Sequence, residues 1–275
     1  MKKLLTILFS AAFFIAQGQS SSTQFFKTYG GSDDEQASKV IQVPGGDYYI
    51  LSTTSSYGTG NKDVYLMRTD GLGEVTWEYA YGTSGNYVAT NMIVTNDGGL
   101  LITGYTDGGG NNRDNGMLLK VTNSGTLSWT KYFYNDSFSS IYGAVESRFG
   151  GYYVAGSSYD DSLDMQVMVA SLSTTGNSFW NKSYGGLSDD FGYAIDEDVA
   201  GRLVVVGSMA NDSVNVGSTG DKDIQVVRLW TNGDISWVKN YGTNADEEAY
   251  NINVDRSDYY ITGYSNGTTL PTQSM

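Results

Sequence analysis

Residues 77–82 read Trp-Glu-Tyr-Ala-Tyr-Gly, and related stretches recur about every fifty residues along the chain. An aromatic residue leads each copy, and the copies begin at Phe25, Trp77, Trp129, Trp180 and Trp237. A second aromatic residue follows four positions later in every copy, at Tyr29, Tyr81, Phe133, Tyr184 and Tyr241. Self-similarity of this period predicts a protein built from similar units, each stacked against its neighbours.

Each unit contains three further strand-like segments. In the first unit these are residues 37–43, 48–52 and 63–68, and the aromatic stretch at 75–81 is the fourth. Glycines lie between the first and second segments and between the third and fourth, as the tight turns of β-hairpins require. A small residue ends the second segment of every unit, at Ser52, Gly104, Gly156, Gly207 and Gly263. Each unit is therefore predicted to hold four short antiparallel strands.

Four strands in a unit of this length match one blade of a β-propeller. A single four-stranded sheet cannot bury both of its faces, whereas blades stacked around an axis bury the faces of their neighbours. A linear β-solenoid is the alternative, but its repeats are shorter, at roughly 20 to 30 residues. Independent domains of this size without disulfides or metals would be only marginally stable. We therefore predict an all-β propeller of four-stranded antiparallel blades.

The order of motifs within the unit resembles that of a known group of repeats. Trp-x-Lys-x-Tyr-Gly, as at 180–185, and Gly-Gly-Tyr-Tyr followed by an aliphatic residue, as at 150–154, are similar to the β-propeller repeats of secreted bacterial proteins. The resemblance is strongest to Bacteroidetes proteins that often carry a C-terminal sorting domain for type IX secretion. It covers about residues 24–265 and implies a fold rather than an activity; beyond residue 265 no sorting domain is recognisable.

The strand count predicts about five blades, four complete and the last incomplete. The last unit has its first two segments at 249–254 and 259–263, but residues 268–275 include Pro271 and make a poor third strand. Two arrangements are open. In one, the ring closes because the N-terminal strand at 25–29 becomes the outer strand of the last blade. In the other, the chain is a fragment of a longer propeller and leaves a strand edge at 259–263 open to pairing.

The N-terminus has the pattern of a secretory signal peptide. Lys2 and Lys3 precede an apolar stretch from Leu4 to Ala16, and small residues follow for cleavage near Gly18. The stretch is too short to span a bilayer, and no other segment approaches the necessary length. We expect a secreted or cell-surface protein. The expected division is a signal peptide at 1–18, a propeller at 19–267 and a tail at 268–275.

The composition excludes several classes of function. The chain has 30 acidic and 16 basic residues and a net charge of −14, which repels nucleic acids and anionic membranes. It has no cysteine and no histidine, so thiol nucleophiles, Ser-His-Asp triads and zinc sites made of Cys or His are excluded. We expect no nucleic-acid partner and no membrane span, and only carboxylates remain as catalytic groups.

Carboxylates that break the repeat are the candidates for such catalysis. Glycosidases use a pair of acidic residues, and five-bladed propellers house enzymes of this kind in their central funnel. The acids that interrupt the repeat are Glu74, Glu78, Glu146, Asp196, Glu197 and Asp198. A glycoside hydrolase is therefore an alternative function, although near-identical blades argue against a site in which different groups converge.

Acidic residues also recur in the loops that follow the aromatic strands. Calcium binds carboxylate and carbonyl oxygens, so repeated loops of this kind suit calcium sites on one rim. The candidate ligands are Asp33, Asp34, Asp189, Asp190 and Asp246. The same residue types stabilise turns by accepting backbone N–H groups, which is the competing explanation. We therefore expect either no cofactor or bound calcium.

Tyrosine is abundant, with 22 residues, and the tyrosines of the aromatic strands are expected in the core. Four tyrosines just beyond the second segments are better candidates for an exposed ligand-binding surface, namely Tyr57, Tyr105, Tyr159 and Tyr264. Aromatic faces beside Asn, Ser and Gly favour recognition of carbohydrate or protein. We predict a secreted, non-enzymatic propeller that acts as a binding or adhesion scaffold. A carboxylate glycosidase and a fragment without activity of its own are the alternatives.

Overall fold

The computed structural model describes residues 25–108, 113–134, 139–159, 164–210, 222–243, 245–256 and 258–267. The predicted signal peptide and C-terminal tail lie outside these ranges. Within them all regular structure is β-strand, in eighteen strands, so the all-β prediction is confirmed. The described part of the chain contains no helix long and apolar enough to cross a membrane.

Four sheets hold four antiparallel strands each and follow one another along the chain, and a fifth sheet holds two strands. The first two sheets consist of β1 (Glu35–Gln42), β2 (Tyr48–Thr54), β3 (Asp63–Thr69) and β4 (Val75–Tyr81), then β5 (Tyr87–Val94), β6 (Leu100–Thr106), β7 (Asn115–Val121) and β8 (Leu127–Phe133). The next two consist of β9 (Ser139–Glu146), β10 (Tyr152–Tyr159), β11 (Met165–Leu172) and β12 (Ser178–Tyr184), then β13 (Asp190–Glu197), β14 (Leu203–Ala210), β15 (Lys222–Leu229) and β16 (Ile235–Tyr241). The last sheet is β17 (Glu247–Asp255) and β18 (Asp258–Ser265).

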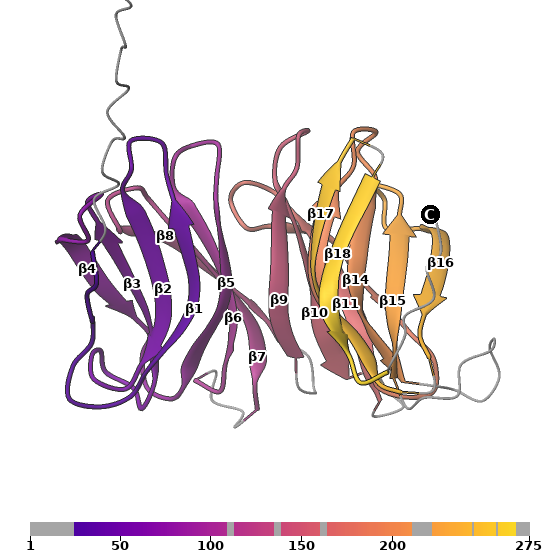
Figure 1. Ribbon diagram of the computed structural model, residues 1–275, viewed down its shortest axis with the longest axis horizontal. Coiled ribbons are helices and arrows are strands. Elements are labelled where there is room, and N and C mark those ends of the chain that lie inside the picture. Colours follow the sequence, from indigo (N-terminus) through magenta and orange to yellow (C-terminus); the bar gives the residue numbers. More distant parts are fainter. Residues whose placement is uncertain are drawn as a thin grey trace, which may run out of the picture.

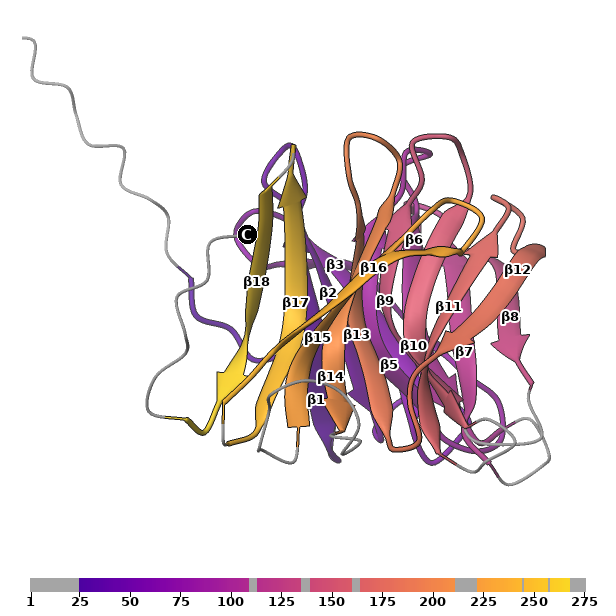
Figure 2. The same cartoon turned by 90° about the vertical axis from the view of Figure 1, so that its right-hand side faces the viewer.

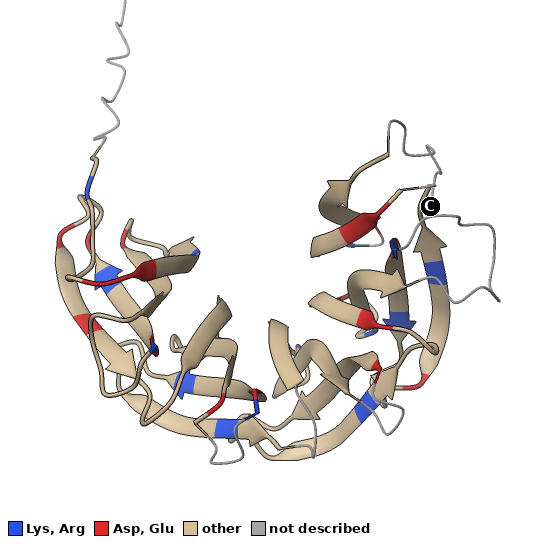
Figure 3. Ribbon diagram, turned by 90° about the horizontal axis from the view of Figure 1, so that it is seen from below, with Lys and Arg blue, Asp and Glu red and all other residues tan. Residues whose placement is uncertain are grey.

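The sheets stand side by side as the blades of a β-propeller (Figure 1). The first strand of each sheet faces the centre and the fourth lies outside, and seen along the axis the blades form an arc rather than a closed ring (Figure 3). The arc opens between the first blade and the two-stranded last blade. The turns within each blade that join its first to second and third to fourth strands form the upper rim in Figure 1, and the other loops form the lower rim.

The core consists of four apolar clusters, each between two adjacent blades. Between the first two blades, Leu51 and Leu66 pack against Met92 and Ile102, all at most 1% exposed. Burial of each such side chain contributes about 1.5–3 kcal/mol relative to leaving it exposed. Because the stabilising surface lies between blades and not within them, the second and third strands are apolar on both faces.

The repeated aromatic residues of the outer strands fasten each blade to the next. The Trp129 and Trp180 Nε1 atoms donate to the carbonyls of Thr174 and Thr231 in the following blade, both at 3.1 Å. The second aromatic residue adds a hydroxyl donor to a turn glycine of the next blade: Tyr81 to Gly125 at 2.6 Å and Tyr184 to Gly233 at 2.5 Å. The four tryptophans are half-buried against the clusters. The regular spacing of these Trp and Tyr residues in the sequence therefore reflects the contacts between successive blades.

The N-terminal segment corrects one expectation. Phe25 to Tyr29 is not a strand and does not pair with β18. The Tyr29 hydroxyl nevertheless donates to Gly73 O at 2.8 Å, and the Phe25 ring packs edge-on against Tyr48 at 6.0 Å. These are contacts that the outer strand of a preceding blade would make. The segment lacks a strand ladder because the last sheet offers no third strand to pair with, and the closed five-bladed ring is not formed in the described part of the chain.

A β-bulge recurs in the innermost strand of every blade and explains the small residue of each unit. In the fourth blade the pairing shifts between Gly192 and Ala194, opposite Gly207. A Cβ added to Gly207 would lie 1.7 Å from the carbonyl oxygen of Phe191. At Gly104, Gly156 and Gly263 the corresponding distance is 2.0–2.1 Å. The bulged backbone therefore leaves no room for a side chain at these four positions.

We expect Gly207→Ala to lower the free energy of unfolding by about 1–3 kcal/mol, because the new methyl group must displace the bulged strand. Urea unfolding of residues 19–275, followed by tryptophan fluorescence, measures the change. Ser52→Ala is the matched control, since the first blade already holds a side chain at this position, and it should change the free energy by less than about 0.5 kcal/mol. Equal effects of the two variants would contradict the explanation.

Candidate functional site

The bulged residues of the innermost strands form a row along the inside of the arc. A bulge re-aims the side chain of its extra residue, so the same position in each blade points away from the regular pleat. The residues at this position are Ser38, Thr90, Tyr142, Tyr193 and Tyr250. The first two are polar and short and donate to the next blade, at Ala89 O (2.7 Å) and Ile141 O (2.6 Å). The last three are tyrosines.

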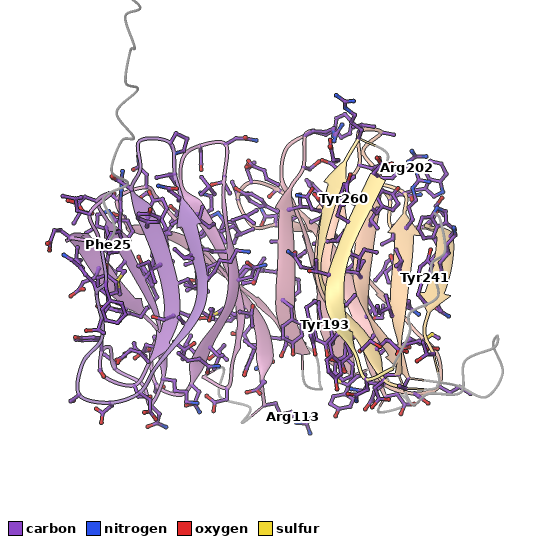
Figure 4. The ribbon with its side chains drawn as sticks, in the orientation of Figure 1. Phe25, Arg113, Tyr193, Arg202, Tyr241 and Tyr260 are labelled. Carbon is purple, nitrogen blue, oxygen red and sulfur yellow. The ribbon has the colours of Figure 1, made fainter. Side chains whose placement is uncertain are left out.

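The three tyrosines contact one another from blade to blade. The ring centroids of Tyr142 and Tyr193 are 5.5 Å apart, and those of Tyr193 and Tyr250 are 5.4 Å apart. Phe191 stacks on Tyr193 at 5.9 Å with an angle of 4° between the rings. Tyr250 ends the row and is 52% exposed, whereas Tyr193 is half-buried on the lower part of the inner wall (Figure 4). We call Tyr142, Phe191, Tyr193 and Tyr250 the inner aromatic row.

Charged groups frame the open end of this row. Glu248 accepts hydrogen bonds from the Tyr250 hydroxyl at 2.7 Å and from Lys222 Nζ at 2.8 Å. The same ammonium group lies 5.4 Å from the centre of the Phe191 ring. Burial raises the pKa of Glu248, but the hydrogen bonds from Lys222 and Tyr250 outweigh it, so this pKa lies below its usual value. The carboxylate is therefore charged at neutral pH and holds the Tyr250 ring in place.

The hydroxyl groups of the row remain protonated at neutral pH. The hydrogen bond to Glu248, together with burial, raises the pKa of Tyr250 to about 12. Burial, assisted by the charge of Glu248, raises the pKa of Tyr193 to about 12. Burial also raises the pKa of Tyr142. The row thus presents neutral rings whose hydroxyls can donate and accept hydrogen bonds.

A central cavity of about 430 Å³ lies next to the row along the innermost strands. Its walls come from the innermost strands, beginning at the residues that directly follow the bulges, such as Gly143, Ala194 and Asn251. Lys39 and Asn91 line the opposite side. The cavity therefore brings amide, ammonium and carboxylate groups together, next to the aromatic row in the chain.

Two of the predicted catalytic acids, Glu146 and Asp196, do line this cavity. Glu146 Oε2 accepts the Asn96 N–H at 2.6 Å. Asp196 accepts the N–H groups of Val254 at 2.7 Å and Glu197 at 2.8 Å, one on each oxygen. These bonds tie the ends of neighbouring inner strands together. Both carboxylates thus act as braces between blades in this structure.

The other predicted acids lie outside the cavity and have structural partners. Glu197 accepts hydrogen bonds from Ser147 and from the Arg148 backbone N–H, and Asp198 forms ion pairs with Arg202 and Arg228 at 2.9 Å. Glu78 accepts the Tyr65 hydroxyl at 2.7 Å, and Glu74 pairs with Lys27. Of the six acids, Glu146 and Asp196 alone line the central cavity.

The predicted calcium ligands lie on the lower rim in separate loops. Asp190 is buried and accepts the Gly186 N–H at 2.7 Å, and Asp189 accepts the Met165 N–H at 2.8 Å. Asp33 accepts the Ser32 hydroxyl, while Asp34 and Asp246 contribute backbone carbonyls to the loops. In the described ranges no three acidic residues come together in a way that would hold a metal ion. A calcium site remains a prediction that the geometry of these loops does not support.

The four predicted surface tyrosines also lie toward the lower rim but on different blades. Tyr57 is 38% exposed, stacks on Tyr65 at 5.0 Å and donates to Gly30 O at 3.0 Å. Tyr105 and Tyr159 are half-buried, and Tyr264 is 44% exposed with its hydroxyl on Asn266. Burial raises the pKa of Tyr105, and the nearby Asp114 and Tyr142 of the inner aromatic row add to this shift.

Sequence reasoning missed the inner aromatic row, although its signal was present. Tyr142, Tyr193 and Tyr250 each lie thirteen residues after a lead tryptophan of the repeat. The equivalent residues in the first two units are not aromatic, so the position does not stand out as part of the motif. Only the bulge shows that these side chains leave the blade and face one another.

The ion pair at the end of the row leads to a pH-dependent prediction. The pKa of Glu248 is lowered on folding, so its contribution to stability is present above pH 4.5 and is lost as the pH falls through the folded-state value. Glu248→Gln should lower the free energy of unfolding by about 1 kcal/mol at pH 7, with the difference shrinking towards pH 3. Urea unfolding at the two pH values tests this. Glu74→Gln, at an exposed carboxylate, is the control and should change the free energy of unfolding by less than about 0.5 kcal/mol. A pH-independent difference would refute the assignment.

No protein-family model and no curated protein matches the sequence. Among solved structures, the chain is similar to a thermostable family-43 glycoside hydrolase, with 13% identity, a TM-score of 0.46, and coverage of 89% of this chain and 80% of that chain. It is also similar to a sucrose-6-phosphate hydrolase from Lactobacillus gasseri, with 11% identity, a TM-score of 0.42, and coverage of 78% and 52%. Likeness at this level carries no information on activity. The sheets of the described residues make the chain a β-propeller with four complete blades and a fifth in which two strands are described.

Proposed function

We propose that this protein is an extracellular, non-enzymatic scaffold that binds carbohydrate along the inner aromatic row and the adjoining cavity. The observation that carries the proposal is the chain of rings from Tyr142 through Tyr193 to Tyr250, with centroids 5.4–5.5 Å apart. Aromatic rings offer apolar faces and, in tyrosine, a polar tip, which suits ligands that are apolar on one side and hydroxylated on the other.

The surroundings of the row support a sugar over other ligands. Glu248 and Lys222 supply a charged acceptor and a charged donor at the exposed end, and Asn251 and Asn91 line the cavity beyond it. Charged and amide groups of this kind orient hydroxyls by hydrogen bonds. The net charge of −14 disfavours polyanions such as nucleic acids.

Hydrolysis is not part of the proposal. A glycosidase needs one carboxylic acid that donates a proton and a second carboxylate that acts as base or nucleophile. Glu146 and Asp196, the acids on the cavity wall, each accept a backbone N–H group from a neighbouring blade. The arrangement favours a binding surface braced by these acids.

The extracellular location rests on the sequence alone. The basic start, the apolar stretch and the small residues before Gln19 suit export, and the repeats resemble those of secreted Bacteroidetes proteins. Fractionation of the natural host, with an antibody against the chain, would find the protein outside the inner membrane. Recovery of the uncleaved chain from the cytoplasm would contradict this part of the proposal.

A glycan array probed with purified residues 19–275 tests the ligand class. We expect selective binding to at least one oligosaccharide, and Tyr250→Ala should weaken it by about three- to tenfold through loss of the exposed end of the row. Tyr134→Ala is the matched control, because Tyr134 is 58% exposed and follows an outer strand. Absence of binding to every glycan, or equal loss in both variants, would overturn the proposal.

A further inference from the structure

One edge of the second strand is exposed in the last sheet, whereas a third strand pairs with this edge in each of the four complete blades. In the four complete blades the second strand pairs on both sides, as β14 does with β13 and β15. In the described part of the chain β18 pairs only with β17, and it lies at the margin of the molecule (Figure 2). Its outward N–H and C=O groups form a template for another strand.

Side chains at this edge are exposed where their counterparts are buried. By register, Tyr260 corresponds to Val204 of the fourth blade. Val204 is 0% exposed, whereas Tyr260 is 58% exposed. Thr262 is exposed where Val206 is buried. Val204 and Val206 are covered by the next blade, so the exposure of Tyr260 and Thr262 shows that this face of β18 has no neighbouring sheet among the described residues.

The outer strand of the fourth blade carries hydrogen-bond donors that have no acceptor among the described residues. Tyr29, Tyr81 and Tyr184 each donate to a turn glycine of the next blade. Tyr241 occupies the same position, yet its hydroxyl has no acceptor among the described residues. The Trp237 Nε1 atom, equivalent to the donors of Trp129 and Trp180, likewise meets no acceptor within the described ranges.

The ammonium group of Lys239, on the same outer strand, also lacks the partner that its counterparts have. In two other units the lysine of this position pairs with the acid directly after the turn glycine: Lys27 with Glu74, and Lys182 with Asp234 at 2.8 Å. Lys239 has no acidic partner in the part of the chain that the structure describes, and its Nζ lies 5.5 Å from the centre of the Trp237 ring.

A hollow of about 410 Å³ lies where the missing turn would sit. Trp237 and Lys239 line it together with Tyr259 of β18. Arg202, Arg228 and Arg256 add positive charge, and of the acids in the wall Asp198 already pairs with Arg202 and Arg228. Figure 4 shows Arg202, Tyr241 and Tyr260 at this end of the arc.

We propose that this end of the molecule binds a β-hairpin of a separate polypeptide, which completes the fifth blade. The first strand of the hairpin pairs with β18, and its turn enters the hollow. Turn carbonyls accept from Trp237 and Tyr241, and an acidic residue directly after the turn glycine pairs with Lys239. The structure thus specifies the ligand as an alternating apolar hairpin with a Gly-Asp or Gly-Glu turn.

The hairpin Lys222–Tyr241 of the protein itself is a ready probe, since it contains the turn Gly233-Asp234. A synthetic version can be preorganised by Gln225→Cys and Asn240→Cys, because these residues face each other across β15 and β16. We expect this labelled peptide to bind residues 19–275 saturably in fluorescence anisotropy. A peptide of scrambled sequence, closed by the same disulfide, should not bind.

Variants of the protein identify the site. Tyr241→Phe should weaken peptide binding by about three- to tenfold, because it removes one donor and keeps the ring. Tyr184→Phe is the matched control: its hydroxyl is already bonded to Gly233 within the protein, so peptide affinity should not change. Circular dichroism confirms that both variants are folded.

A charge exchange gives the decisive result. Lys239→Glu should weaken binding of the original peptide by at least about threefold, and Asp234→Lys in the peptide should restore it. The proposal is overturned if the preorganised peptide does not bind at millimolar concentration, if Tyr241→Phe and Tyr184→Phe have equal effects, or if the exchange fails to rescue affinity. Concentration-dependent self-association that the peptide cannot compete away would show that a second copy occupies the edge instead.

Discussion

The structure depends on one constraint: each sheet is apolar on both faces and is too small to be stable alone. Every stabilising cluster therefore lies between two blades, as where Leu51 and Leu66 meet Met92 and Ile102. Hydrogen bonds such as Trp180 to Thr231 then set the angle and height at which successive blades meet. Stability of this kind grows with each added neighbour, and among the described residues the blades at the two ends of the arc have one neighbouring blade each (Figure 3).

The bulges of the innermost strands connect this packing to the candidate site. At each bulge the innermost strand lies very close to the second strand of its own blade, as the carbonyl of Phe191 beside Gly207 shows. The extra residue must then point out of the sheet, and in three successive blades this residue is a tyrosine. The inner aromatic row thus follows from blade geometry together with the tyrosines that the last three blades place at the bulges.

Acidic residues have a different role from the one their number suggests. With 30 of them and no histidine or cysteine, carboxylates dominate the polar chemistry of the chain. Glu146, Glu197 and Asp196 accept backbone N–H groups from neighbouring blades, and Asp190 does so within its own loop. Because the blades repeat, backbone N–H donors of this kind recur where two blades meet. The acidic residues that accept from them recur for the same reason.

Sequence patterns were enough to predict the fold class, the four strands of the complete units and the turns between them, because period, alternation and glycine position are local properties. The predicted outer strand at 75–81 coincides with β4 (Val75–Tyr81). The patterns did not reveal that Tyr142, Tyr193 and Tyr250 form a row, or that Phe25 to Tyr29 lacks a ladder. Those features depend on a shifted register and on which blades become neighbours. Only the tertiary structure decides such relations, because they join residues about fifty positions or more apart through backbone geometry that no short motif encodes.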